Sequence, residues 1–358
     1  MSGPQLKVKS FDISKRLVFE PWERVRANAR APGVDAVTIT EFAAGERANL
    51  YKLWNRMSSG SYFPGPVRAV EIPKDHGAGV RTLGVPHDLP LKAVAHHTSE
   101  RWVLLCIERW LKAPMQMPDG TLVPREKGTP QGSPISPLLA NLFMHYAFDR
   151  WMDREHPGCR FERYADDILA HCDTEEQARN LRVNIAARLG ALGLELHPDK
   201  TKVVYCKDGR RRGNAEHTSF DFLGYTFRAR LANGRRGLFA GFLPAISQKA
   251  RKAVGQKVRS WHLNRRTGTN LPGLARGINA QVRGWINYYG AFYRSELYSL
   301  AMRINEHLVR WAMQKFKRLR GQPAKAWAWL DAVRQHHPRL FAHWHMLPRT
   351  NCRPVGAG

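Results

Sequence analysis

The 358-residue sequence is poor in acidic residues, and this scarcity is its strongest bulk signal. Its 57 lysines and arginines outnumber 30 aspartates and glutamates, which gives a net charge of +27. A field of this sign and size attracts polyanions, so nucleic acid is the expected partner. An anionic membrane is the alternative, but no basic amphipathic segment stands apart from the rest of the chain.

Cysteines are few and scattered, at Cys106, Cys159, Cys172, Cys206 and Cys352. Their odd number and the lack of a C-x-x-C pair argue against a disulfide framework and a zinc knuckle. No apolar run reaches the ~20 residues of a membrane span, and the first residues lack the apolar stretch of a signal peptide. We therefore expect a cytoplasmic protein in a reducing compartment, with no membrane partner.

An acidic pair stands in otherwise apolar surroundings, in Tyr164-Ala165-Asp166-Asp167. Burying two carboxylates costs several kcal/mol unless a cation compensates. A hairpin that carries Asp166 and Asp167 into a cleft would form an oxygen site for Mg²⁺, the ion that orients and neutralises phosphates in phosphoryl transfer. The alternative is an exposed Asp-Asp turn without chemistry.

Three segments before this pair have recognisable patterns. Residues 1–60 form an N-terminal helical segment, with a second helix expected from about Glu41 to Ser58. Residues 66–86 alternate apolar and polar side chains on both sides of a turn, which predicts a hairpin with Lys74 and Arg81 near its tip. Basic side chains there can bind a triphosphate, and the alternative is that they are solvated turn charges. Gly128–Pro137 is a loop that leads into a helix and offers backbone N–H groups to an anion.

The region that follows residue 227 is basic and aromatic. Residues 228–320 contain 20 lysines and arginines but only two acids, Glu296 and Glu306. Aromatic residues recur at helical spacing, so part of each helix face belongs to a core and the rest is basic. This pattern is typical of a helical domain that binds a nucleic-acid backbone.

In chain order, these patterns resemble the motifs of a reverse transcriptase. The succession is a Lys/Arg hairpin, Pro130-Gln131-Gly132, Tyr164–Asp167, His197-Pro198-Asp199-Lys200-Thr201 and Phe222-Leu223-Gly224-Tyr225. Val282–Tyr289 is similar to the maturase-specific domain of group II intron-encoded proteins. Each motif alone is weak, but their order is specific and covers nearly the whole chain.

The resemblance implies an α+β right-hand polymerase with an antiparallel palm sheet, followed by an all-α thumb or maturase domain. Its domains would be an N-terminal helical segment (1–60), fingers and palm (61–227), the maturase-specific domain (228–320) and a basic tail (321–358). Its partners would be group II intron RNA, a DNA target or primer and, if the protein is active, dNTPs, with Mg²⁺ as cofactor. A dimer is left open.

The resemblance also assigns residues to roles. Asp166 and Asp167 would be the catalytic, metal-binding pair. The nucleotide and template site would contain Lys74, Arg81, Gln131, Gly132, Tyr164, Ala165 and Lys200. The primer grip would be Phe222, Leu223, Gly224 and Tyr225, and RNA would contact Arg283, Trp285, Tyr288, Tyr289 and Arg294.

One motif of the family is missing. The family places a strand with the first catalytic Asp several dozen residues after the finger hairpin, but here Leu83–Pro86 is followed at once by His87–Val94. That second piece resembles the helix beyond the missing strand, which predicts an internal deletion after Pro86. Two-metal transfer needs carboxylates that bridge both ions, so we expect impaired Mg²⁺ binding and a polymerase that is weak or inactive. Asp88 begins a helix instead, where a capping role is expected.

Three hypotheses remain. The chain is an active group II intron reverse transcriptase and maturase, a non-enzymatic RNA-binding remnant, or a decayed gene product. The missing motif favours the second and third over the first.

Overall fold

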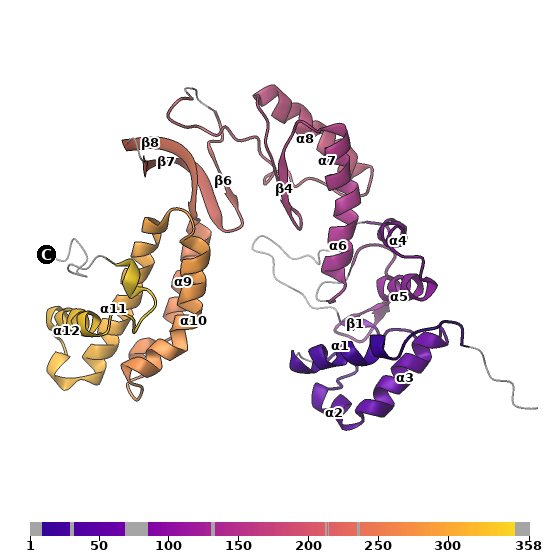
Figure 1. Cartoon of the computed structure of the whole chain (residues 1–358), viewed down its shortest axis with the longest axis horizontal. Helices are drawn as coiled ribbons and strands as arrows, with labels where there is room; N and C mark the ends of the chain where they lie inside the picture. Colours follow the sequence, from indigo (N-terminus) through magenta and orange to yellow (C-terminus); the bar gives the residue numbers. More distant parts are fainter. Residues whose placement is uncertain are drawn as a thin grey trace, which may run out of the picture. The chain divides into compact units, whose positions relative to one another are not determined.

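The structure, a computed structural model, describes residues 9–28, 32–68, 85–129, 133–211, 213, 215–234 and 237–347. The chain divides into two compact units, Met1–Thr201 and Lys202–Gly358. Each combines helices with small sheets (Figure 1), as the expected mixed class requires. Within the described ranges, no helix has both the length and the apolar character needed to cross a membrane.

Unit 1 begins with three helices, α1 (Arg16–Ala27), α2 (Ile39–Ala44) and α3 (Glu46–Ser58). The side chain of Thr38 caps α2 by accepting the N–H of Glu41 at 3.2 Å, and the Glu41 carboxylate accepts the Thr38 N–H at 2.8 Å. A single helix from Glu41 to Ser58 was therefore a wrong prediction. The break falls at Gly45 (φ −117°, ψ 30°), and glycine is among the weakest helix formers.

Next come β1 (Val67–Arg68), α4 (Asp88–Ala95), α5 (Arg101–Lys112), β2 (Met115–Gln116) and β3 (Leu122–Val123). β1 pairs parallel with β2, and β2 pairs antiparallel with β3. The segment around the expected deletion contacts residues 127 and 128. Pro86 forms a bridge with Lys127, and the buried His87 ring hydrogen-bonds the Gly128 carbonyl at 2.9 Å. Asp88 is the first residue of α4 and pairs with Lys92 at 3.6 Å.

The second half of unit 1 consists of a helical run, a hairpin and another helix. The run joins α6 (Ser136–Met144), a π-helical turn η1 (His145–Asp149) and α7 (Arg150–Glu155). The hairpin is β4 (Phe161–Tyr164) and β5 (Asp167–Ala170), and α8 (Glu175–Gly190) follows. Fully buried Phe148 and Met152 pack with Leu181, so the run, the hairpin and α8 share one core.

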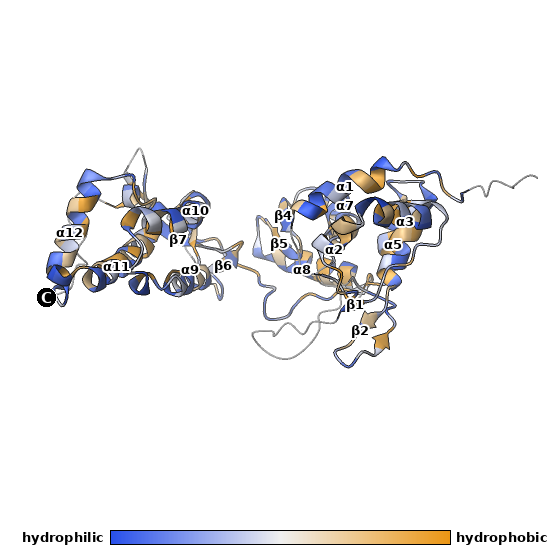
Figure 2. Ribbon diagram, turned by 90° about the horizontal axis from the view of Figure 1, so that it is seen from below, coloured by the Kyte–Doolittle hydropathy of each residue, from blue (hydrophilic) through white to orange (hydrophobic). Residues whose placement is uncertain are grey.

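Unit 2 opens with an antiparallel sheet in the order β6-β7-β8, formed by β6 (Ser219–Phe222), β7 (Tyr225–Gly234) and β8 (Gly237–Ile246). Helical elements follow: α9 (Gln248–Ser260), η2 (Leu263–Arg265), α10 (Leu271–Tyr289), η3 (Arg294–Leu297), α11 (Tyr298–Lys315), η4 (Lys317–Leu319), α12 (Pro323–His336) and η5 (Trp344–Met346). Both apolar and polar residues occur along α10 and α11 (Figure 2), as expected for helices with one buried face. Their core contains Leu274, Ile304, Trp311 and Trp344, each at most 2% exposed.

Candidate functional site

The acidic pair lies at the tip of the β4–β5 hairpin. Tyr164 pairs with Asp167, so Ala165 and Asp166 form a two-residue turn. Ala165 has φ 55°, a left-handed conformation that costs a residue with a Cβ on the order of 1 kcal/mol. Asp166, Asp167 and Tyr164 are all exposed. The hairpin thus presents two carboxylates to solvent, where their oxygens suit a hard cation.

Arg163 holds this turn in place. Its guanidinium donates to both carboxylate oxygens of Asp149, at 2.6 and 2.7 Å, and to Asn141 Oδ1 at 3.0 Å. It also donates to the carbonyl of Ala165 at 3.0 Å. The Arg163 side chain is only 10% exposed. A buried arginine therefore ties the turn to α6 and η1, a role that was not predicted from the sequence.

Only part of the remaining nucleotide-site assignment falls on described residues. Lys74, Arg81, Gln131 and Gly132 lie outside the described residues. Lys200 is exposed in a turn after α8. Its backbone N–H donates to the His197 carbonyl at 3.3 Å, which closes the turn. In the described part of the chain, no three His, Cys, Asp or Glu side chains are grouped to hold a metal.

In unit 2, the turn between β6 and β7 contacts α10. Leu223 (φ 49°) and Gly224 (φ 78°) are both left-handed, as a type I′ hairpin turn requires. The Tyr288 hydroxyl donates to the Leu223 carbonyl at 2.8 Å, and the Tyr225 hydroxyl donates to the Tyr288 carbonyl. A Cβ on Gly224 would lie 3.1 Å from the Tyr289 hydroxyl oxygen, so a larger residue would crowd this contact.

Tyr225 of the expected primer grip therefore shares one aromatic cluster with Tyr288 and Tyr289 of the expected RNA-binding set. Tyr225 is buried, and this burial raises its pKa, with Tyr288 and Tyr289 adding to the effect. Trp285 stacks on Trp261 with ring centroids 5.6 Å apart. Tyr288 keeps 48% of its surface exposed. Of these aromatic rings, Tyr288 is the one best placed to meet a ligand.

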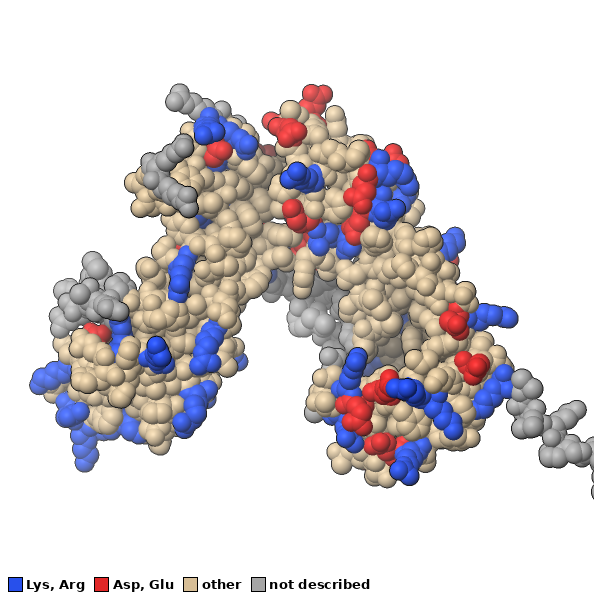
Figure 3. Space-filling view, in the orientation of Figure 1, with Lys and Arg blue, Asp and Glu red and all other residues tan. Residues whose placement is uncertain are grey.

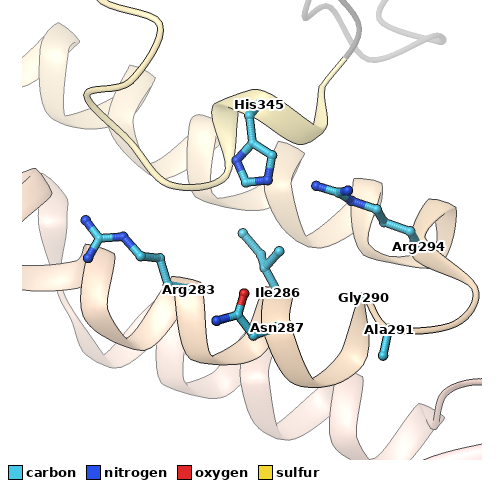
Figure 4. A pocket seen from close by; sticks show the side chains of 7 residues that line it. All are labelled: Arg283, Ile286, Asn287, Gly290, Ala291, Arg294 and His345. Atoms are coloured by element: carbon cyan, nitrogen blue, oxygen red, sulfur yellow. The ribbon is translucent and has the colours of Figure 1, made fainter.

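Arg283 and Arg294 line a separate groove of about 270 Å³. Ile286 and Asn287 of α10, the Gly290-Ala291 turn and His345 of η5 complete it (Figure 4). No carboxylate lines the groove, and neither guanidinium has an acidic partner within the described ranges. Two positive groups beside an amide and an imidazole form a surface suited to phosphate.

The nearest acid to this groove in sequence is already neutralised. Glu296 receives hydrogen bonds from Arg230 at 3.1 Å and from Arg251. Burial alone would raise the pKa of Glu296, but the Arg251 hydrogen bond and the charges of Arg251 and Arg230 outweigh it and hold the pKa below its usual value. In Figure 3, basic side chains dominate the visible face of the helical part of unit 2, whereas unit 1 shows both signs.

Two family models match the chain. Residues 84–227 match the reverse transcriptase (RNA-dependent DNA polymerase) model, and residues 251–329 match the group II intron, maturase-specific domain. Together, in this order, the two matches support a group II intron reverse transcriptase and maturase. Reverse transcriptase domains generally use Mg²⁺, and both domains imply nucleic-acid partners such as intron RNA.

A curated relative matches the chain at low identity. The chain is 25% identical to the protein YkfC of Escherichia coli (strain K12) over an alignment of 284 residues. The alignment covers 51% of this chain and 74% of the relative.

Proposed function

We propose that this protein binds group II intron RNA through unit 2 and has little or no polymerase activity. The observation that carries the binding proposal is the groove between α10 and η5, in which Arg283 and Arg294 face no carboxylate. Phosphates are the anions of RNA, and guanidinium groups bind them in a bidentate manner. The exposed ring of Tyr288 adds a surface on which an unpaired base can stack.

The binding proposal predicts that Arg283→Ala with Arg294→Ala weakens RNA binding about tenfold near physiological salt. It also lowers the slope of log Kd against log salt by about two, because each lost phosphate contact removes roughly one released counterion. The measurement is a salt titration of the full chain with a group II intron transcript.

The matched control is Arg154→Ala with Arg179→Ala, which removes two exposed arginines that already pair with Glu155 and Glu175. This variant loses the same charge but keeps the groove, so its salt slope should stay close to that of the parent. Equal losses in the two double variants would refute a specific groove and leave only general attraction by the net charge.

The proposed polymerase defect concerns unit 1. We infer that the β4–β5 hairpin is the acidic hairpin of a palm and that the facing catalytic Asp is absent, because no Asp followed by an aromatic pair occurs between residues 60 and 130. Asp166 and Asp167 would then bind Mg²⁺ weakly, since they stand on one turn without an opposite carboxylate.

The length of the match to YkfC supports the deletion. An alignment of 284 residues that uses only 51% of a 358-residue chain must set many residues of the relative against gaps in this one. The contacts of Pro86 and His87 with residues 127 and 128 give the junction a packed setting.

The remaining assignments are proposals on the same basis. Fingers and palm would occupy 61–227 after the N-terminal helices of 1–60, the maturase-specific domain 228–320 and the basic tail 321–358. Lys74, Arg81, Gln131, Gly132, Tyr164, Ala165 and Lys200 would serve the nucleotide and template site, and Phe222–Tyr225 the primer grip.

A further inference from the structure

Two of the scattered cysteines meet at the open end of the acidic hairpin. Phe161 pairs with Ala170, and the N–H of His171 donates to the Arg160 carbonyl at 2.8 Å. The same register places Cys159 opposite Cys172. The two thiols are close enough to interact, because the Cys159 thiol contributes to raising the pKa of Cys172.

The position of this pair, two residues beyond the last pair of the ladder, suits a disulfide. Arg160 and His171 occupy a hydrogen-bonded site, so Cys159 and Cys172 occupy the next, non-hydrogen-bonded site. Opposed Cα atoms at such sites lie about 4.5 Å apart, within the roughly 4.4–6.8 Å range that disulfides span.

A groove runs beside the buried Cys159. It has a volume of about 360 Å³, and Cys159, His156, Thr174 and Gln177 are among the residues that line it. Gln177 Nε2 approaches Cys159 Sγ to 3.3 Å. Polar and apolar surfaces contribute about equally to the lining, and an oxidant would approach Cys159 from this side.

We propose that Cys159 and Cys172 form a redox-sensitive pair that closes into a cross-strand disulfide when it meets a small disulfide oxidant such as oxidised glutathione. One cysteine attacks the oxidant as its thiolate and releases one glutathione thiol. The other cysteine then attacks the mixed disulfide and releases the second. One protein S–S bond forms, two S–H bonds break, and the two protons and two electrons leave with two molecules of reduced glutathione.

The reduced pair resists mild oxidation. Burial, with the neighbouring Cys159 thiol as the next cause, raises the pKa of the Cys172 thiol to about 11. The thiolate is the reactive form, so closure is slow near pH 7 and faster as pH rises. In a reducing compartment the pair stays open and closes only under a strong oxidising load.

Closure would stiffen the element that carries the acidic pair. The bond would close a 14-residue loop, Cys159 to Cys172, with Asp166 and Asp167 at its far end. A two-stranded hairpin is only marginally stable by itself, so a covalent link across its open end limits opening of the strands.

The test is to treat the folded full-length chain with oxidised glutathione at pH 8.5 and map its tryptic peptides without reduction. Trypsin cuts after Arg160 and Arg163, so the two cysteines fall in separate peptides, 155–160 and 164–179. We expect these peptides to be joined and 2 Da lighter than their sum, and reduction to separate them. Glutathione held on either cysteine without a link, or a link to another cysteine instead, would overturn the proposal.

A thermal measurement checks the consequence. Oxidation should raise the unfolding midpoint of the wild-type chain by about 5 °C, and Cys172→Ala should abolish this rise. Cys206→Ala, a half-buried cysteine of unit 2, is the matched control and should keep the rise. An equal rise in all three proteins would contradict the assigned pair.

Discussion

Arg163 shows how much a single side chain can determine at the candidate site. Its guanidinium satisfies Asp149, Asn141 and the carbonyl of Ala165 at once, while 80% of the Asp149 side chain is buried. Removing it would leave the mostly buried Asp149 carboxylate with only the His145 ring, 3.4 Å away, and would release the carbonyl of Ala165 in the turn. Such a loss is large because a buried charge that loses its bidentate partner is costly.

We expect Arg163→Ala to lower the free energy of unfolding by about 2–3 kcal/mol in urea denaturation. Arg163→Lys should recover only part of this, because an ammonium group cannot reproduce a bidentate contact. Arg179→Ala is the control, since its pair with Glu175 is exposed and worth less than about 0.5 kcal/mol. If Arg163→Ala costs no more than Arg179→Ala, the clamp does not exist.

Among the elements, η5 and the segment before it depend on buried polar contacts. The Asn279 side chain donates to the Leu340 carbonyl at 2.8 Å and accepts the Ala342 N–H at 2.9 Å. Fully buried His343 donates from Nε2 to Asn305 Oδ1 at 2.8 Å. These contacts hold the segment that places His345 in the proposed RNA groove.

The buried imidazole makes this segment sensitive to acid. Burial, with Arg334 and His345 adding to it, lowers the pKa of His343 to about 3, against roughly 6.5 in an unfolded chain. The neutral His343 ring therefore makes its full contribution to the free energy of unfolding above pH ~6.5. This contribution is lost as pH falls from there toward ~3, by about 1.4 kcal/mol for each pH unit.

Urea denaturation at pH 7.5 and 5.5 should show a loss of about 1.4 kcal/mol from this group. The His343→Gln side chain cannot titrate. Between the two pH values, the free energy of unfolding of this variant should therefore fall by about 1.4 kcal/mol less than that of the parent. His345→Gln, at an exposed position, should behave like the parent. Identical pH dependence in His343→Gln and the parent would show that His343 is not buried as a neutral ring.

For the molecule as a whole, the order of motifs was enough to predict the family, because sequence order and spacing survive without any knowledge of contacts. The α+β class was implied by that resemblance, and the mixture of helices and small sheets agrees with it. The contacts of Arg163 were not predictable, because Asn141 and Asp149 lie 22 and 14 residues upstream. Only the packing of the helical run against the hairpin brings them together.

The same limit explains the cysteines and the aromatic cluster. Cys159 and Cys172 looked scattered in the sequence, and only the hairpin register makes them neighbours. Tyr225 and Tyr288 were assigned to separate roles, yet a hydrogen bond joins them across 63 residues. Helical spacing could not distinguish Trp285, which stacks on Trp261, from the exposed Tyr288.

The most direct test of the proposed function is single-turnover primer extension with excess protein on an RNA template annealed to a DNA primer, in Mg²⁺ and dNTPs, with binding followed in the same sample. We expect the template and primer to be bound but no extended product to form, and Asp166→Ala to behave like the parent. Extension by the parent that Asp166→Ala abolishes would contradict the account, because it would show that the acidic hairpin supports catalysis without the missing motif.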